Sequence, residues 1–114
     1  MNITITIEKQ AKSSIVHVSG KIDATTADEL ENAMVELLEE QEKNIILDME
    51  GTNYISSAGL RVLIVIAKQM YDSGHFCLCN ASDNVQEIIQ MSGFNVFMSI
   101  YDDLSTAKEM IAEE

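Results

Sequence analysis

The segment NIILDMEGTNYISSAGL (residues 44–60) contains an apolar run, a turn and the beginning of a helix. The apolar run at 44–49, followed by turn residues at 51–53, is typical of a buried strand with parallel neighbours. A helix is expected from 56 to 73, because apolar residues recur there at helical spacing and two serines offer N-cap hydroxyls. The β-branched residues at 62–66 favour a strand when taken alone, but the longer periodicity outweighs them. Gly74 is the expected C-cap of this helix.

The residues before this segment predict a hairpin and a helix. Isoleucines alternate with polar residues over 3–8, and a second β-branched run occupies 14–19, so two strands joined by the polar residues 9–13 are expected. A helix is expected to begin at Asp23-Ala24-Thr25-Thr26, with Asp23 as its N-cap through the amide of Thr25 or Thr26. Its predicted buried face runs at helical spacing and consists of Ala27, Leu30, Ala33, Met34, Leu37, Leu38 and Gln41.

The residues after the segment predict further alternation of strands and helices. A buried strand is expected at 75–79, and then a short helix that is capped by Ser82 or Asp83 and stopped by Gly93. Residues 96–100 are expected to form a strand or an extended connection. Asp102 and Asp103 open a last helix.

The element order β-β-α-β-α-β-α-(β)-α predicts an α/β fold. We expect an N-terminal β-hairpin followed by alternating βα units, with one central mixed sheet of four or five strands covered by about four helices. The length of 114 residues fits a single domain over 1–114.

The charge of the chain excludes several classes of function. There are 7 Lys and Arg against 19 Asp and Glu, a formal net charge of -12. A nucleic-acid-binding protein needs a basic surface, and an electrostatic membrane anchor needs a basic segment, so neither nucleic acid nor membrane is an expected partner. No apolar run is long enough to cross a membrane, and the N-terminus lacks the basic region and cleavage site of a signal peptide, so a cytoplasmic location is expected.

The cysteines and histidines do not suggest a metal site or a catalytic site. Cys77 and Cys79 are two positions apart on a predicted strand, so both are expected to point to one face as small buried side chains. No other cysteine or clustered histidine completes a zinc set, and no cofactor is expected. His17 and His75 each stand alone on a strand-like segment and are expected to be structural.

The sequence Tyr54-Ile55-Ser56-Ser57-Ala58-Gly59-Leu60 is where chemistry is expected, because it joins a buried strand to a helix N-terminus. The simplest interpretation is that the serines only cap the helix. A serine nucleophile is disfavoured, because there is no G-x-S-x-G elbow and no histidine placed as a base. A Walker-type phosphate loop is absent, but covalent phosphorylation remains open, since a helix N-terminus tolerates or favours a phosphate.

Four segments resemble those of STAS domains, the family of bacterial anti-sigma factor antagonists and of sulphate-transporter cytoplasmic domains. The segment VSGKIDA (18–24) resembles the Gly-x-[Leu/Ile]-Asp entry to the first helix, and 45–49 resembles the central strand. The segment at 54–60 resembles the [Asp/Ser]-Ser-[Ser/Thr/Ala]-Gly-Leu signature, and 89–94 resembles a weaker motif that ends in Gly-[Leu/Phe]. The resemblance covers residues 3 to 112 and implies the STAS fold.

The resemblance implies a binding protein and not an enzyme. Such an antagonist binds an anti-sigma factor that is also a serine kinase with a histidine-kinase-like ATPase fold. The kinase phosphorylates the signature serine, here Ser57, and is then released; a PP2C-type phosphatase restores the hydroxyl. Ser56 stands where many antagonists carry Asp, so Ser56 is the alternative phosphoacceptor. The alternative function is a STAS module that binds a ligand or scaffolds a complex without phosphorylation, and a hydrolase using Ser57 ranks third.

The expected partner-binding face surrounds Ser57. Asp23 is expected to lie near it, because crossover connections of one hand bring strand-to-helix junctions to one edge of the sheet. Arg61 follows Ser57 by four residues and could pair with a phosphate or with an acidic group of the partner; the alternative is a solvated charge near Asp or Glu. The face consists of Asp23, Ala24, Thr25, Thr26, Ser56, Ser57, Ala58, Gly59 and Arg61.

Overall fold

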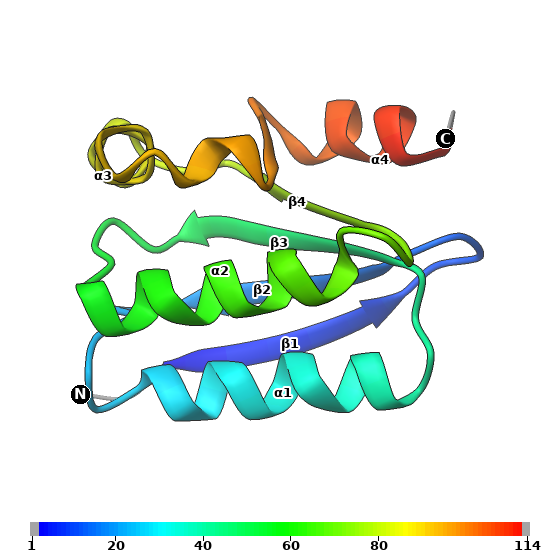
Figure 1. Cartoon of the computed structure of the whole chain (residues 1–114), viewed down its shortest axis with the longest axis horizontal. Helices are drawn as coiled ribbons and strands as arrows, with labels where there is room; N and C mark the ends of the chain where they lie inside the picture. Colours follow the sequence, from blue (N-terminus) through cyan, green and yellow to red (C-terminus); the bar gives the residue numbers. More distant parts are fainter. Residues whose placement is uncertain (1–2, 113–114) are drawn as a thin grey trace.

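The computed structural model describes residues 3–112 and has the predicted α/β fold (Figure 1). Its elements alternate after an N-terminal hairpin, and the number of strands is five. In chain order they are β1 (Thr4–Lys9), β2 (Ser14–Ser19), α1 (Ala27–Glu39), β3 (Asn44–Gly51), α2 (Ser57–Met70), β4 (His75–Cys79), α3 (Asp83–Ser92), the 3-10 turn η1 (Phe94–Val96), β5 (Ser99–Tyr101) and α4 (Leu104–Ala112).

The sheet is mixed, and its strands follow one another in space in the order β1-β2-β3-β4-β5. β1 and β2 are antiparallel, and each later pair is parallel. The register places Leu47 of β3 beside Val16 of β2 and Leu78 of β4, and all three are fully buried. Because β2, β3 and β4 are parallel, their carboxyl ends share one edge of the sheet, from which α1, α2 and α3 follow.

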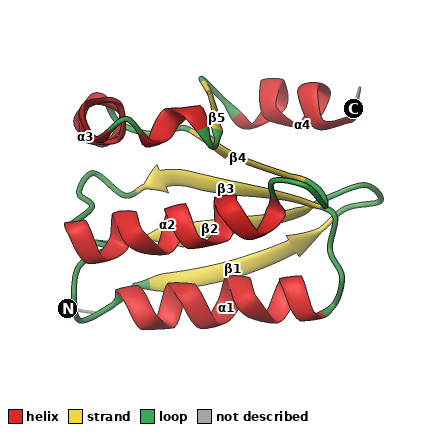
Figure 2. Ribbon diagram, in the orientation of Figure 1, coloured by secondary structure: helices red, strands yellow, loops and turns green. Residues whose placement is uncertain are grey.

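The two faces of the sheet are covered unequally (Figure 2). α1 and α2 lie side by side on one face, and together with α3 they enclose the larger core, which contains Leu30, Leu63 and Val85. α4 covers part of the other face. Its smaller core consists of Ile15, Ile46, Cys77, Cys79, Ala107 and Ile111.

The prediction that both cysteines are buried on one face is confirmed. Cys77 and Cys79 are both buried and pack in the core beneath α4. Burial raises the pKa of the Cys79 thiol to about 12, so this side chain stays neutral and unreactive at physiological pH.

The predicted boundaries of the first helix are wrong at both ends. Asp23 is not its N-cap, because the chain first makes a turn and α1 begins at Ala27 with Thr26 in the capping position. The predicted hydrogen bond from the Thr25 N–H to the Asp23 carboxylate is present at 2.9 Å, but it lies inside that turn. At the other end Gln41 lies beyond the helix, exposed and with a left-handed φ of 64°, so it is not part of the buried face.

The prediction that Gly74 is the C-cap of α2 is also wrong, because Tyr71 takes that position. α2 ends at Met70, and Gly74 is not among the described residues with positive φ. Glycine is needed here for close packing: a Cβ at this position would overlap the Lys43 carbonyl oxygen and lie 2.9 Å from its carbon. That carbonyl accepts the N–H of His75 at 2.8 Å, so the turn before β3 and the turn before β4 meet at Gly74.

The expected caps of the last two helices are confirmed, but the strand between these helices is displaced from its predicted position. The Ser82 hydroxyl accepts the Val85 N–H at 3.2 Å, and α3 stops at Gly93, whose φ is 79°. The predicted strand at 96–100 is shorter and lies at Ser99–Tyr101. Asp103 caps α4 by accepting the Thr106 N–H at 2.8 Å.

His17 was expected to be structural, and it has two carboxylate partners that the sequence did not indicate. Its Nδ1 lies 2.8 Å from Oδ2 of Asp48 on β3, and its Nε2 lies 3.0 Å from Oε1 of Glu8 on β1. A neutral imidazole has a single N–H, so only the charged form donates to both carboxylates. The hydrogen bond to Glu8, followed by that to Asp48, raises the pKa of His17 above its usual 6.5, and the pKa of Glu8 is lowered in return.

We expect this cluster of His17, Glu8 and Asp48 to make the free energy of unfolding depend on pH. The raised pKa of His17 means that its contribution is complete below pH 6.5 and is lost as the pH rises through the folded-state value. The lowered pKa of Glu8 means that its contribution is present above pH 4.5 and is lost as the pH falls. The wild type should therefore exceed His17→Gln in stability most clearly between these two pH values.

The measurement is urea unfolding of both proteins across this pH range. The cluster is partly exposed, so the maximum difference in the free energy of unfolding should stay below about 1 kcal/mol. Glu8→Gln serves as the matched variant, because it removes one carboxylate and leaves the contact between His17 and Asp48. A difference between wild type and His17→Gln that is constant with pH would contradict the assignment.

Candidate functional site

Two loops meet at the carboxyl edge of the sheet, one after β2 and one after β3. Ile22 and Ile55 form an isolated parallel bridge there. The Ile22 N–H donates to the Tyr54 carbonyl at 3.2 Å, and the Ser56 N–H donates to the Ile22 carbonyl at 2.8 Å. The predicted proximity of the Asp23 loop and the serine segment is therefore confirmed at the level of the backbone.

Side chains inside the first loop hold it in a fixed shape. The Thr26 hydroxyl is buried, accepts the Asp23 N–H at 2.9 Å and donates to the Lys21 carbonyl at 2.8 Å. The Asp23 carboxylate accepts both the N–H and the hydroxyl of Thr25, and these bonds lower the pKa of Asp23. Asp23, Thr25 and Thr26 thus shape the loop that carries Ile22, while Ala24 is exposed on its surface.

The two serines have different environments. The Ser56 hydroxyl accepts the Gly59 N–H at 3.3 Å as the N-cap of α2, and the side chain is half-buried. Ser57 is exposed at the first position of α2, and its hydroxyl has no hydrogen-bond partner within residues 3–112. The positive end of the α2 dipole lies at this position, where it favours a negatively charged group.

Gly59 allows the first turn of α2 to pack directly on the bridge below it. A Cβ at this position would lie 2.5 Å from the Ile22 side chain and 2.8 Å from that of Ile55. Glycine is therefore required at position 59, because α2 approaches Ile22 and Ile55 too closely for any side chain. It sets the distance between the Ser57 helix turn and the sheet edge.

Arg61 lies on the exposed side of α2, one turn after Ser57. It lines a hollow of about 140 Å³ between α1 and α2, together with Ala58 and the acidic residues Asp28 and Glu31. Among the described residues Arg61 forms no ion pair, although both carboxylates line the same hollow. Its guanidinium is thus available to a phosphate on the same helix or to a partner.

Three residues of this edge, Tyr54, Lys21 and Asn84, were missing from the predicted face. Tyr54 is 41% exposed on the loop before α2, and the Lys21 ammonium lies 6.0 Å from the centre of its ring. Asn84 of α3 donates to the carbonyl of Asn53 at 3.1 Å and ties the same loop to the next helix. Tyr54 stands inside the quoted signature, so its position was visible in the sequence, but its exposure was not.

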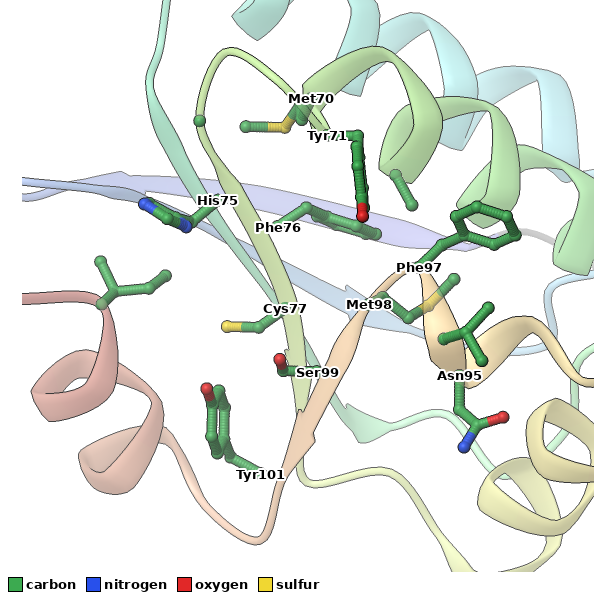
Figure 3. Close-up of a pocket in the computed structure, with 14 residues that line it drawn as sticks. Met70, Tyr71, His75, Phe76, Cys77, Asn95, Phe97, Met98, Ser99 and Tyr101 are labelled. Atoms are coloured by element: carbon green, nitrogen blue, oxygen red, sulfur yellow. The ribbon is translucent and has the colours of Figure 1, made fainter. Parts of the chain in front are cut away.

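A second recess lies at the other end of α2 (Figure 3). It has a volume of about 290 Å³ and is lined mainly by aromatic and apolar side chains, among them Met70, Phe76 and Tyr101. The rings of Tyr71 and Phe97 meet edge to face with centres 6.4 Å apart. The recess is separated from Ser57 by the length of α2, so it is not part of the serine site.

The side chains around Ser57 can bind a partner, and the Ser57 hydroxyl can accept a phosphoryl group. His17 is engaged with two carboxylates in the middle of the sheet, and His75 lies at the opposite end of the strands, so neither serves Ser57 as a base. Within residues 3–112 no group of three or more His, Cys, Asp or Glu side chains is arranged so that it could hold a metal ion. The described helices are also too short or too polar to cross a membrane.

Comparison with known proteins identifies the fold family. The model of the STAS domain matches residues 4–107. The chain belongs to the STAS domain family. This STAS domain is 33% identical over 91 residues to BtrV of Bordetella bronchiseptica, with 79% of this chain and 78% of BtrV covered. It is 29% identical over 105 residues to the anti-sigma F factor antagonist of Paenibacillus polymyxa, with 90% of each chain covered.

Solved structures confirm the STAS fold. The crystal structure of an anti-sigma factor antagonist from Mycobacterium paratuberculosis has a TM-score of 0.90 at 24% identity, with 96% of this chain and 94% of that chain covered. The phosphorylated form of the Bacillus cell fate determinant SpoIIAA has a TM-score of 0.73 at 14% identity, with 94% and 99% covered. At these identities the structures establish the shared STAS fold.

Proposed function

We propose that this STAS domain is an anti-sigma factor antagonist whose binding is switched by phosphorylation of Ser57. Named antagonists among the relatives support the class of function. The observation that carries the switch is the exposed Ser57 hydroxyl, free of hydrogen bonds within residues 3–112, beside a Ser56 hydroxyl that already caps α2. The expected partners are an anti-sigma factor serine kinase with a histidine-kinase-like ATPase fold and a PP2C-type phosphatase. The expected location is the cytoplasm.

In the proposed reaction the STAS domain is a substrate and the kinase is the catalyst. The Ser57 oxygen attacks the γ-phosphorus of ATP, the bond from that phosphorus to the bridging oxygen breaks, and ADP leaves as the hydroxyl proton is lost. The phosphatase reverses the modification by adding water to the phosphorus, which returns the hydroxyl and inorganic phosphate. The phosphate adds about -1.5 to -2 charges at the helix N-terminus, where the fold tolerates it.

The experiment is phosphorylation by defined kinases. Each kinase of the histidine-kinase-like ATPase fold encoded in the source genome is purified and incubated with the protein and ATP, and intact mass reports the transfer of a phosphoryl group. Wild type and Ser56→Ala should be modified, although Ser56→Ala loses about 1 kcal/mol of capping. Ser57→Ala should not be modified. Modification of Ser57→Ala at the wild-type rate, or of no protein by any kinase, would refute the proposed switch.

Arg61 is expected to contribute to binding and not to folding. Arg61→Ala should weaken binding to the kinase identified above by about fivefold, because an exposed charge contributes up to about 1 kcal/mol. Lys68→Ala is the matched control, since it removes one positive charge from the last turn of the same helix. Calorimetric titration and thermal melting check both variants. Equal affinities for Arg61→Ala and Lys68→Ala would remove Arg61 from the site.

A further inference from the structure

We propose that Tyr54 is the anchor side chain with which the anti-sigma factor engages this edge of the sheet. Its ring enters an apolar pocket of the partner, and an acidic group at the mouth of that pocket pairs with Lys21. This inference rests on the proposed function and adds to it the kind of surface that the partner must present.

The position of Tyr54 is fixed by the backbone that also positions Ser57. Its carbonyl accepts the Ile22 N–H at 3.2 Å, and two residues later the Ser56 N–H bonds back to Ile22 at 2.8 Å. Tyr54 therefore stands on a short loop held at both sides of the Ile22–Ile55 bridge, three residues before the exposed serine. A kinase that reaches the Ser57 hydroxyl must approach this loop.

The exposure of Tyr54 makes it suitable as an anchor. Tyrosine buries a large, rigid surface on binding and loses little conformational entropy, and it is enriched among the residues that dominate interface energies. The residue is 41% exposed, although backbone hydrogen bonds hold the loop around it. Tyr71 is even more exposed, at 67%, but it lies at the end of α2 that is remote from Ser57 and already packs against Phe97.

Lys21 indicates the chemistry at the mouth of the partner pocket. Its ammonium lies 6.0 Å from the Tyr54 ring centre, at the outer limit of a cation–π contact. When the ring enters an apolar pocket, the ammonium loses water with it. An unpaired charge in that position is costly, so the partner is expected to place a carboxylate there.

The test is steady-state phosphorylation by the kinase identified through intact mass. Tyr54→Ala should raise KM by about tenfold or more and leave kcat within about twofold, because the anchor contributes binding that does not change at the reacting phosphorus. Tyr54→Phe should behave almost like the wild type, since the ring is kept. Tyr71→Ala is the matched control: it removes an exposed tyrosine from the far end of α2 and should leave KM unchanged.

Tyr54→Gln controls for the possibility that Tyr54→Ala changes the conformation of the loop, because glutamine keeps a long side chain and removes only the aromatic surface. It should raise KM like Tyr54→Ala while its melting temperature matches that of the wild type. Unchanged KM in Tyr54→Ala, with Ser57 still phosphorylated, would overturn this inference and leave the proposed function intact. A fall in kcat with constant KM would also overturn it, since Tyr54 would then position Ser57 and not dock the partner. Failure of every kinase to modify the wild type would overturn both proposals.

Discussion

Ser57→Asp should lose binding to the anti-sigma factor by about a hundredfold and still melt within a few degrees of the wild type. The loss is expected because a partner surface that fits a neutral hydroxyl would have to desolvate and face a carboxylate, a cost of about 2–5 kcal/mol. The small change in stability follows from the position of Ser57, which is exposed in the first turn of α2 where the helix dipole favours a negative charge.

The measurement is calorimetric titration of the anti-sigma factor, with thermal melting of the same samples. Ser57→Asn is the matched control, because asparagine has nearly the same size and shape as aspartate but no charge. This variant should retain most of the affinity for the anti-sigma factor. Equal affinity for Ser57→Asp and wild type would contradict an electrostatic switch. A large drop in the melting temperature would show that the substitution acts on the fold.

Gly74→Ala should be among the most destabilising single-methyl additions in the chain. The new Cβ would overlap the Lys43 carbonyl oxygen. The carbonyl is part of the backbone and the Cβ is bonded directly to a backbone atom, so neither can move aside without displacing β3 or β4. We expect a loss of about 3 kcal/mol in the free energy of unfolding, which corresponds to a decrease of roughly 10 °C or more in the melting temperature.

Gly93→Ala is the comparison variant for Gly74→Ala. It adds a Cβ that strains the backbone without overlapping another group. Gly93 has a φ of 79° with nothing within 4 Å of an added Cβ, so its substitution should cost only about 1–2 kcal/mol. Thermal and urea unfolding of both variants measures the two costs. If Gly74→Ala were less destabilising than Gly93→Ala, the close contact with Lys43 would not hold in solution.

The order and type of the elements could be predicted because their signals are local. The helical spacing over 56–73 correctly outweighed the strand-like run inside it, and that run now contributes the buried residues Val62, Leu63 and Ile66 of α2. The ends of the first helix could not be predicted in the same way. Side-chain hydrogen bonds at Asp23 and Thr26 stabilise a turn there, and a capping residue and a turn residue look alike in a sequence.

The parts of the site that were missed depend on register and exposure. His17 was interpreted as isolated because Asp48 is 31 positions away, and only the parallel register of β2 and β3 places them side by side. The Ser57 position followed from the family resemblance, but the different environments of Ser56 and Ser57 depend on where α2 begins. Tyr54 and Lys21 come together through the Ile22–Ile55 bridge, and no local pattern predicts such a bridge.

The strand order has a consequence for how the chain acquires its structure during synthesis. Each strand pairs with the strand that precedes it in the chain, so every addition to the sheet can use an edge that already exists. Loop closure is therefore limited to one crossover at a time, which favours rapid folding from the N-terminus. The Ile22–Ile55 bridge beside Ser57 lies within the span from β1 to α2, so all the residues that form it are synthesised before β4, β5 and the last helices.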